Sequence, residues 1–337
     1  MKYRLIMTLF LLLIIGRLLA GEYGDAFIEI GISARAAAMG SSLGALDTSI
    51  TAFLYNPAGI SQMGRFSTAL MYTSVFGLAN HNYFGIGFQI NQQSRIGINW
   101  IRFSVDDIPE RPDVIRQILD PAARREYVLA LDNRTLNRFN DIENALFITY
   151  AQHIHRTVDP GWRYTRFKVQ IPWGLSVKLL HKSIYNLSAY GIGLDFGGKL
   201  RVRGSDLVEW QRLGYLNFGM IWRDITSTML YWNSRRQDEI PPSVALSFAL
   251  EQPVTRFNGK MNLSVEKNFR FDDKIYIGLE WNWRNQLAFR AGYRNQQWSA
   301  GMGTRLNILG YLWAVDYAFI GHTDLGASHR IGGVLSL

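Results

Sequence analysis

The sequence between Lys274 and Arg294 alternates between large apolar residues and small or polar ones. Side chains of a β-strand point to opposite faces with a period of two, so this stretch predicts strands with one bulky face and one polar face. The bulky parity comprises Ile275, Ile277, Leu279, Trp281, Trp283, Leu287, Phe289, Ala291 and Tyr293. In a soluble sandwich such a face packs on a second sheet, whereas in an outer-membrane barrel it meets lipid and the opposite face lines a polar lumen. The alternation therefore favours a transmembrane β-barrel.

The same alternation recurs from Arg65 to the end of the chain. It marks about fourteen candidate strands, and an even number is what a bacterial single-chain barrel requires. They lie near residues 66–75, 82–91, 94–105, 143–154, 166–180, 187–200, 212–222, 243–250, 258–266, 274–284, 286–295, 297–306, 310–319 and 327–337. Around Trp100–Phe103 the apolar parity shifts, which predicts a β-bulge. The expected fold is all-β, a single antiparallel barrel built from residues 65–337.

Two connections between the candidate strands are long, Asp106–Asp141 and Arg223–Pro242. The first contains several prolines and predicts short helices near Val114–Leu119 and Ala122–Leu131. Both connections follow odd-numbered strands, so they emerge at the same end of the barrel. Outer-membrane barrels have long extracellular loops and short periplasmic turns, so we expect both connections to be extracellular.

Residues 1–20 have the pattern of a secretory signal peptide. Lys2 and Arg4 precede an apolar run from Leu5 to Ile15, and Ala20 is a small residue suited to cleavage. The apolar run of about eleven residues is too short to anchor the chain by crossing a bilayer. We therefore expect the mature chain to begin at residue 21.

Composition narrows the class of protein further. The chain has no cysteine, which excludes a lipoprotein, a disulfide framework and thiol chemistry. A mean hydropathy of −0.04 is too low for a bundle of transmembrane helices. The formal charge falls from +9 to +6 when Lys2, Arg4 and Arg17 leave with the signal peptide. The remaining basic residues are dispersed, so no nucleic-acid partner is expected, and contact with anionic lipid explains them equally well.

Residues 21–64 differ from the rest of the chain. This hatch segment is rich in alanine, glycine and serine and ends with a turn signal, Tyr55-Asn56-Pro57-Ala58-Gly59. Small side chains permit close packing in a confined space, so the segment is suited to lie inside the barrel mouth. The alternative is a first strand followed by an ordinary linker.

Two parts of the hatch segment, Gly31–Gly40 and Leu46–Gly59, resemble the N-terminal signature of the PorV/PorQ family, within the FadL-like group of outer-membrane barrels. The stretch Asp224–Thr228 and the closing stretch Asp316–Ile331 are similar to that family as well. The resemblance implies a fourteen-stranded barrel whose N-terminal segment folds inward as a plug or hatch. The matching hatch positions are Gly31, Arg35, Met39, Gly40, Asp47, Asn56, Pro57 and Gly59.

Charged residues also occupy the parity that should face the lumen. A buried charge without a partner is costly, so these side chains must pair, bind the hatch segment or line a solvated route. They are Lys178, Asp195, Glu280, Arg290, Arg294, Arg305 and Asp316. Of the two interpretations, a network that clamps the hatch is favoured over a solute pathway.

Catalytic motifs are weak in this sequence. His153 and His155 share one strand face, but no cysteine or carboxylate completes a metal-ligand set. Gly191, Gly193 and Gly197 imitate a nucleotide-binding loop, yet they lie in an alternating strand where glycine relieves crowding in a narrow lumen. We therefore expect no catalytic residue, no metal and no cofactor.

Three functions are compatible with this pattern. The resemblance implies an outer-membrane accessory of protein secretion or surface attachment, as in type IX secretion, with secreted or secretion-machinery proteins as partners. The alternative is FadL-like passive transport of hydrophobic small molecules across the outer membrane. A third class is a soluble periplasmic β-protein whose sheet edges are buried by dimerisation. Outer-membrane lipid is the expected surrounding in the first two cases.

Overall fold

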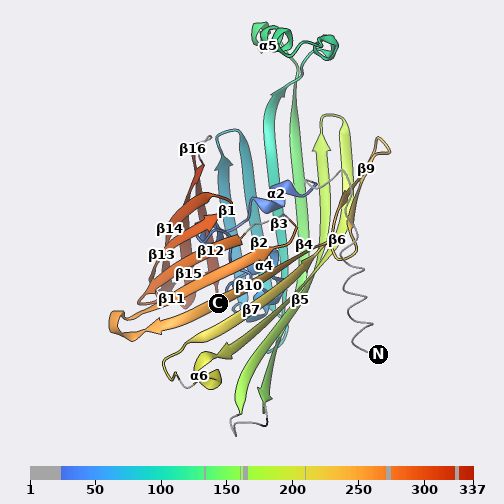
Figure 1. The fold of residues 1–337 in the computed structure, drawn as a ribbon. Coiled ribbons are helices and arrows are strands. Elements are labelled where there is room, and N and C mark those ends of the chain that lie inside the picture. The colour runs from blue at the N-terminus through green and yellow to red at the C-terminus, as the bar shows by residue number, and fades with distance from the viewer. Residues whose placement is uncertain are drawn as a thin grey trace.

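The computed structural model describes residues 24–132, 134–159, 161, 166–208, 210–270, 275–322 and 326–337. Within these residues the strands form one antiparallel sheet that closes into a barrel of fourteen strands. Two further strands form a hairpin that extends the wall (Figure 1). The expected signal peptide, residues 1–20, lies outside the described residues.

All fourteen expected strands are present, most with ends within a few residues of the expected ones. The main differences are β4, which begins at Arg138, and β5, which continues to Ile184. In chain order the wall strands are β1 (Phe66–Val75), β2 (Ala79–Gln89), β3 (Ser94–Pro109), β4 (Arg138–Val158), β5 (Phe167–Ile184), β6 (Leu187–Arg203), β7 (Tyr215–Arg223), β10 (Ser243–Val254), β11 (Gly259–Asn268), β12 (Ile275–Trp283), β13 (Leu287–Arg294), β14 (Gln297–Ile308), β15 (Tyr311–His322) and β16 (Gly326–Ser336).

The barrel closes because β1 pairs with strands on both of its sides. Met71 lies opposite Tyr83 of β2 and opposite Gly332 of β16. β5 pairs with β6 along most of its length, which completes the circle. In the part of the chain that the structure describes, each of the fourteen wall strands pairs on both sides, so burial of their edges by dimerisation is not needed.

The two faces of each wall strand meet different surroundings. In β12 the side chains of Ile275, Ile277 and Leu279 are 47%, 41% and 42% exposed on the outside. The alternate residues Tyr276 and Glu280 are buried inside. An apolar outer face over the whole wall is what a lipid environment requires. The closed wall and its apolar outer face are those of an outer-membrane β-barrel.

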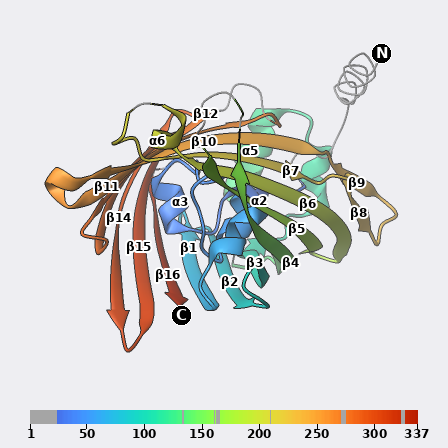
Figure 2. The ribbon, with the colours of Figure 1, turned by 90° about the horizontal axis from the view of Figure 1, so that it is seen from below.

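The hatch segment lies inside the ring of strands, as Figure 2 shows for α2 and α3. Its helices are α2 (Ala26–Glu29), α3 (Ala34–Ala38), α4 (Ala52–Tyr55) and η1 (Pro57–Gln62). The Ser33 hydroxyl caps α3 by accepting from the Ala36 N–H, and Asn56 caps η1 in the same way through Ala58. The alanines of α3 leave room for its helix to approach the wall.

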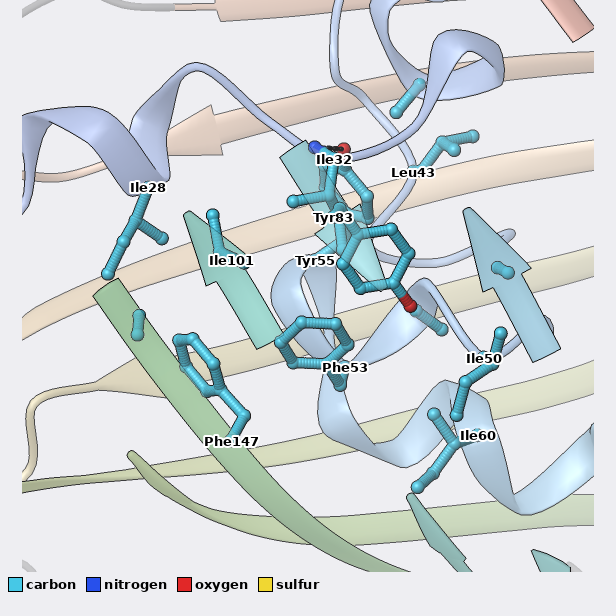
Figure 3. Packing of buried hydrophobic residues seen from close by; sticks show 14 of the residues in the cluster. Ile28, Ile32, Leu43, Ile50, Phe53, Tyr55, Ile60, Tyr83, Ile101 and Phe147 are labelled. Carbon is cyan, nitrogen blue, oxygen red and sulfur yellow. Dashed lines mark hydrogen bonds between the residues drawn. The ribbon is translucent and has the colours of Figure 1, made fainter. Parts of the chain in front are cut away.

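The apolar core of the molecule is the contact between the hatch segment and the wall (Figure 3). Phe53 of α4 lies 4.9 Å from Phe147 of β4, measured between ring centroids, and 6.1 Å from Tyr83 of β2. Ile101 of β3 is fully buried in the same cluster. The barrel interior is therefore packed on this side, and its apolar inward residues meet the hatch segment.

The bulge expected around Trp100–Phe103 is wrong. The pairing of β3 with β2 and β4 runs without a break through these residues, and the register shifts only between Val105 and Ile108. The apolar parity changes because Ile101 and Phe103 point inward and pack on the hatch core. The inward side chains of β3 become apolar where they meet the hatch core, and in the sequence this looks like a change of register.

The connection between β3 and β4 projects far beyond the rest of the wall (Figure 1). It carries η2 (Asp113–Gln117) and α5 (Pro121–Ala130), close to the expected helices. Asp120 caps α5 by accepting from the N–H groups of Ala122 and Ala123, and Pro121 occupies the first turn. The other short helices, α6 (Gly204–Leu207) and η3 (Thr255–Phe257), lie at the opposite end. No helix in the described part of the chain is long and apolar enough to cross a membrane.

The second long connection is not only a loop. It contains β8 (Thr228–Trp232) and β9 (Gln237–Ile240), which pair with each other and, through β8, with the upper part of β6. Both long connections leave the same end of the barrel, and the turns at the other end are mostly short. We assign the long-loop end to the cell exterior and the opposite end to the periplasm on this basis.

Candidate functional site

The candidate site is the boundary between the hatch segment and the inner wall. Its central contact is Arg35 of α3, whose Nε and Nη2 donate to the two carboxylate oxygens of Glu280, each at 2.9 Å. The fork of a guanidinium matches a carboxylate in this two-bond geometry. Arg35 Nη1 also lies 3.6 Å from Asp47 within the hatch segment. Burial by itself would lower the pKa of Arg35, but the nearby carboxylates, Glu280 foremost, outweigh burial and raise that pKa.

Glu280 continues the network into the wall. Its Oε2 accepts from Arg290 Nε at 2.6 Å, and Arg290 Nη1 lies 2.8 Å from Asp316 Oδ1. The amides of Asn262 and Asn282 also donate to Glu280, at 2.8 and 3.0 Å. Positive and negative groups alternate along the network from Arg35 through Glu280 and Arg290 to Asp316. Each of these buried charges therefore has a partner of opposite sign.

Glycines on both sides let the hatch backbone lie directly against the wall beside this network. Gly40 has φ +59, and a Cβ there would lie 2.6 Å from the Tyr293 carbonyl oxygen and 2.8 Å from that of Ile277. On the wall, a Cβ at Gly292 would lie 2.1 Å from the Gly40 nitrogen, and one at Gly278 would meet the backbone of Met39. Met39 itself is fully buried. Close backbone contact of this kind leaves no room for side chains.

The remaining hatch positions form a second set of contacts nearer the periplasmic end. The Asp47 carboxylate accepts from the hydroxyls of Ser49 and Thr51, both at 2.9 Å. Lys199 of β6 donates to the Asp47 carbonyl. A Cβ at Gly59 would lie 2.5 Å from that same carbonyl oxygen. The turn Tyr55–Gly59 therefore requires glycine at residue 59.

Asn56 joins the hatch segment to two wall strands. Its Nδ2 donates to the carbonyls of Gly198 and Met220, at 3.1 and 3.2 Å, while its Oδ1 accepts from Ala58. Pro57 follows and packs where Gly174 and Gly197 of the wall have no side chain. Gly31, at the other end of the motif, has φ +85 and lies beside Tyr55. Burial raises the pKa of the Tyr55 phenol, whose oxygen accepts from Ile32 N at 3.3 Å.

Three contacts at the extracellular end were not expected. Asp25 forms a two-bond ion pair with Arg270, at 2.6 and 2.7 Å. Arg330 Nη1 donates to the Ile30 carbonyl at 2.6 Å. The Glu266 carboxylate accepts from Gly44 N at 3.0 Å. Each residue lies at the inward parity or at a strand end, but their pairing follows from the register of the closed barrel.

The seven lumen candidates fall into two groups and one outlier. Glu280, Arg290 and Asp316 form the network around Arg35, while Arg294 binds the upper hatch through Ser41, at 3.0 Å, and Glu29, at 3.5 Å. Lys178 and Asp195 lie on the opposite wall and are buried. Arg305 shares the inward parity but is only partly buried, near the periplasmic end of β14.

Lys178 lies where the pairing of β6 with β7 and β8 is interrupted. Its Nζ lies 3.1 Å from Asp195 and 2.7 Å from Asp224. β6 pairs with β7 up to Trp222 and with β8 from Leu230, so residues 223–229 are not part of a ladder with β6. One backbone bond, Ile225 N to Leu194 O at 2.9 Å, ties this segment to β6. Asp224 was quoted above only as part of a family-like stretch, and its burial beside Lys178 was not foreseen.

Two hollows adjoin the hatch segment. A small cavity of about 40 Å³ is lined by the apolar side chains of Ile28, Leu54 and Phe147 and by the charged side chains of Lys178, Asp195 and Arg223. A vestibule of about 340 Å³ opens at the extracellular end. Its apolar lining includes Ile30, Val75, Phe76 and Ile320, with the guanidinium groups of Arg294 and Arg330 beside them. Glu29, Ser41 and Arg294 line both hollows, so they form the partition between them.

The histidine pair considered above lies away from this boundary. The rings of His153 and His155 touch edge to face, with centroids 4.3 Å apart near the periplasmic end of β4. Among the described residues no group of three or more histidine, cysteine or acidic side chains is arranged to hold a metal ion.

No protein-family model matches this chain, and no curated protein matches it. Among solved structures it is similar to the toluene transporter TbuX of Ralstonia pickettii, with 9% identity and a TM-score of 0.48 over 90% of this chain and 97% of that one. The toluene transporter TodX of Pseudomonas putida gives 12% identity and 0.45 over 90% and 97%. A FadL homologue of Pseudomonas aeruginosa gives 8% identity and 0.46 over 90% and 96%.

Proposed function

We propose that this chain lets hydrophobic small molecules cross the outer membrane, with residues 21–64 acting as a movable hatch. The observation that carries the proposal is that three adjacent features share lining residues. The vestibule and the small cavity share Glu29, Ser41 and Arg294, and the small cavity reaches the interrupted wall at Lys178, Asp195 and Arg223. A molecule entering the vestibule would meet apolar side chains first and the Glu29–Arg294 partition next.

The interrupted wall supplies the way out of the barrel. Between β6 and residues 223–229 the ladder is replaced by one backbone bond and the Lys178 ion pairs, so separating them disrupts few backbone hydrogen bonds. An apolar solute leaving there passes sideways into lipid and avoids the aqueous periplasm. Passive movement of this kind needs neither a cofactor nor a catalytic group, in keeping with the sequence.

The small cavity of about 40 Å³ has room for water but not for a larger solute, so transport requires the hatch to move. A disulfide between hatch and wall tests this directly, because the chain has no cysteine of its own. The hydroxyl oxygens of Ser42 and Ser264 lie 2.7 Å apart, which suits the pair Ser42→Cys/Ser264→Cys. The matched control is Thr149→Cys/Ser176→Cys, whose oxygens are also 2.7 Å apart but join two wall strands.

The assay follows uptake of the fluorescent probe N-phenyl-1-naphthylamine by cells that express each variant. Oxidation of the Ser42–Ser264 pair should reduce uptake to that of cells without the protein, and a reductant should restore it. The wall–wall control should take up probe in both states. Uptake that is indifferent to the hatch disulfide would overturn hatch movement, and an intact protein that adds nothing to uptake would overturn transport.

A second function, the accessory of protein secretion implied by the PorV/PorQ resemblance, is favoured by one feature. The β3–β4 connection projects beyond the barrel and carries α5, none of whose residues is buried. Leu119 and Leu129 in this connection are 87% and 76% exposed. Exposed apolar side chains on a projecting element are typical of protein contact sites.

Replacing residues 112–135 by a short turn separates the two functions. Under the secretion proposal the shortened protein loses secreted or secretion-machinery proteins that co-purify in mild detergent, and probe uptake is unchanged. If the full-length protein is recovered alone from native membranes, the secretion role is not supported.

A further inference from the structure

A third hollow lies on the outside of the barrel at the periplasmic end, away from the hatch. It is a cleft of about 580 Å³ between the turn that joins β10 to β11 and the turn that joins β12 to β13. Aromatic rings form its walls and two guanidinium groups form its rim. The residues that matter are Arg256, Phe257, Trp281, Trp283, Arg284 and Phe289.

The cleft is built by a tie between its two turns. Arg284 N donates to the Asn258 carbonyl at 2.9 Å, and both residues have positive φ, +51 and +48. The Trp281 ring lies so close to β11 that a Cβ at Gly259 would be 2.5 Å from it. Phe257 meets Trp281 edge to face, with ring centroids 6.3 Å apart. The aromatic walls are therefore held in place before any ligand arrives.

The aromatic walls belong to the lipid-facing side of the barrel. Trp281 and Phe289 lie opposite each other in the β12–β13 ladder and share the outward parity of Ile277 and Leu279. An acyl chain lying against this outer face would run continuously from the cleft toward the middle of the bilayer. A water-soluble ligand would gain nothing from these walls, whereas a lipid is already in contact with them.

The rim of the cleft carries positive charge from Arg256 and Arg284. Arg284 Cζ lies 4.9 Å from the Trp283 ring, and Arg256 Cζ lies 5.9 Å from the Phe257 ring. None of the described residues that line the cleft is acidic, and both arginines are exposed. Two guanidinium groups at the edge of an aromatic band match the height at which a lipid phosphate lies above its acyl chains.

We propose that this cleft binds a phospholipid of the periplasmic leaflet, with Arg256 and Arg284 on its phosphate and Phe257, Trp281 and Phe289 along its upper acyl chains. The site is independent of the proposed transport function. Its position at the short-turn end selects a phospholipid of that leaflet, since the lipid phosphates of the outer leaflet lie at the opposite end of the barrel.

The test measures phosphatidylglycerol binding to the full-length protein in detergent by native mass spectrometry. The double variant Arg256→Gln/Arg284→Gln should bind about tenfold more weakly, as the loss of charge-assisted contacts of about 1.4 kcal/mol implies. The variant Phe257→Ala should weaken binding too, because it removes an aromatic wall and no charge. A matched control, Arg116→Gln/Arg235→Gln, removes two exposed arginines at the extracellular end and should bind normally.

Each outcome bears on the proposal. Equal phosphatidylglycerol affinity in the Arg256→Gln/Arg284→Gln variant and in the control would overturn it. Displacement of the lipid by a large excess of inorganic phosphate would assign the rim to free phosphate instead. Unchanged lipid binding together with loss of a co-purifying periplasmic protein would identify the cleft as a protein interface. Heat-modifiable gel mobility establishes that every variant compared is a folded barrel.

Discussion

The two sides of the barrel hold the hatch segment in different ways. On the side of β12–β15, Arg35 enters a continuous network with Glu280, Arg290 and Asp316, and glycines bring the backbones into contact. On the side of β6–β8, the wall itself is interrupted and Lys178 bridges the gap to Asp224. We call the contacts of Arg35 with β12–β15 the anchor of the hatch segment. The interrupted part of the wall beside Lys178 is the part that the proposed function requires to open. Under the proposed function, the contacts that hold the hatch segment and the route past it would lie on opposite walls of one lumen.

The largest loss of stability is expected when Glu280, which binds both Arg35 and Arg290, is replaced. Glu280→Gln leaves Arg35 and Arg290 buried without their shared carboxylate, which costs about 3–5 kcal/mol. The free energy of unfolding, followed in urea by tryptophan fluorescence in lipid vesicles, checks this. Glu266→Gln is the control, because Glu266 accepts a hydrogen bond from Gly44 N that an amide oxygen also accepts. If both variants lose the same stability, the network around Glu280 is not the anchor.

A somewhat smaller loss is expected where backbones meet. Gly40→Ala places a Cβ at positive φ and within 2.8 Å of wall carbonyls, so we expect a cost of about 2–3 kcal/mol. Gly77→Ala also has positive φ but has nothing within 4 Å, and should cost only about 1 kcal/mol. The same unfolding assay compares them. Equal losses would mean that backbone strain alone explains both.

On the interrupted side the effect should appear in permeability more than in stability. Asp195→Asn removes one of the two acids beside Lys178 but leaves Asp224 in place, so the cost should be about 1–2 kcal/mol. Uptake of N-phenyl-1-naphthylamine should rise because the closing contact is weaker. Uptake equal to that of the unaltered protein would count against an opening of the wall beside Lys178.

The smallest effect is expected for an exposed ion pair between an aspartate and a basic residue, in contrast to the buried pair of Asp195 and Lys178. Asp159 and Arg166 lie 3.4 Å apart with side chains 54% and 77% exposed, where solvent screens the attraction. Asp159→Asn should therefore change the free energy of unfolding by less than about 0.5 kcal/mol. A loss comparable to that of Asp195→Asn would show that burial is not what separates the two sides.

Much of the wall was predictable because parity is a local property. Each residue of β12 faces lipid or lumen according to its place in the strand, so the pattern can be recognised without knowing the partners. The hairpin β8–β9 was missed because its strands are short and β9, Gln237–Ile240, is mostly polar. The shift near Trp100 was misread because Ile101 packs on the hatch core, a contact that only the folded chain provides.

The candidate site divides in the same way. Arg35 and Glu280 were each singled out from the sequence, one by the hatch signature and the other by inward parity. Their pairing spans most of the chain and depends on where the hatch lies in the closed barrel. Asp25 and Arg270 carried no local signal, since each becomes a partner only when residue 25 reaches the extracellular end.

The sequence alone determined that this chain forms an alternating, lipid-facing wall with a small-residue segment ahead of it. That follows because lipid and lumen act on each strand residue separately, with a period of two. The tertiary structure decided which charges meet, that β7 and β8 are separated by an interruption, and that the Trp281 cleft faces outward between two turns. These depend on strand register and barrel closure, which join residues distant in the chain.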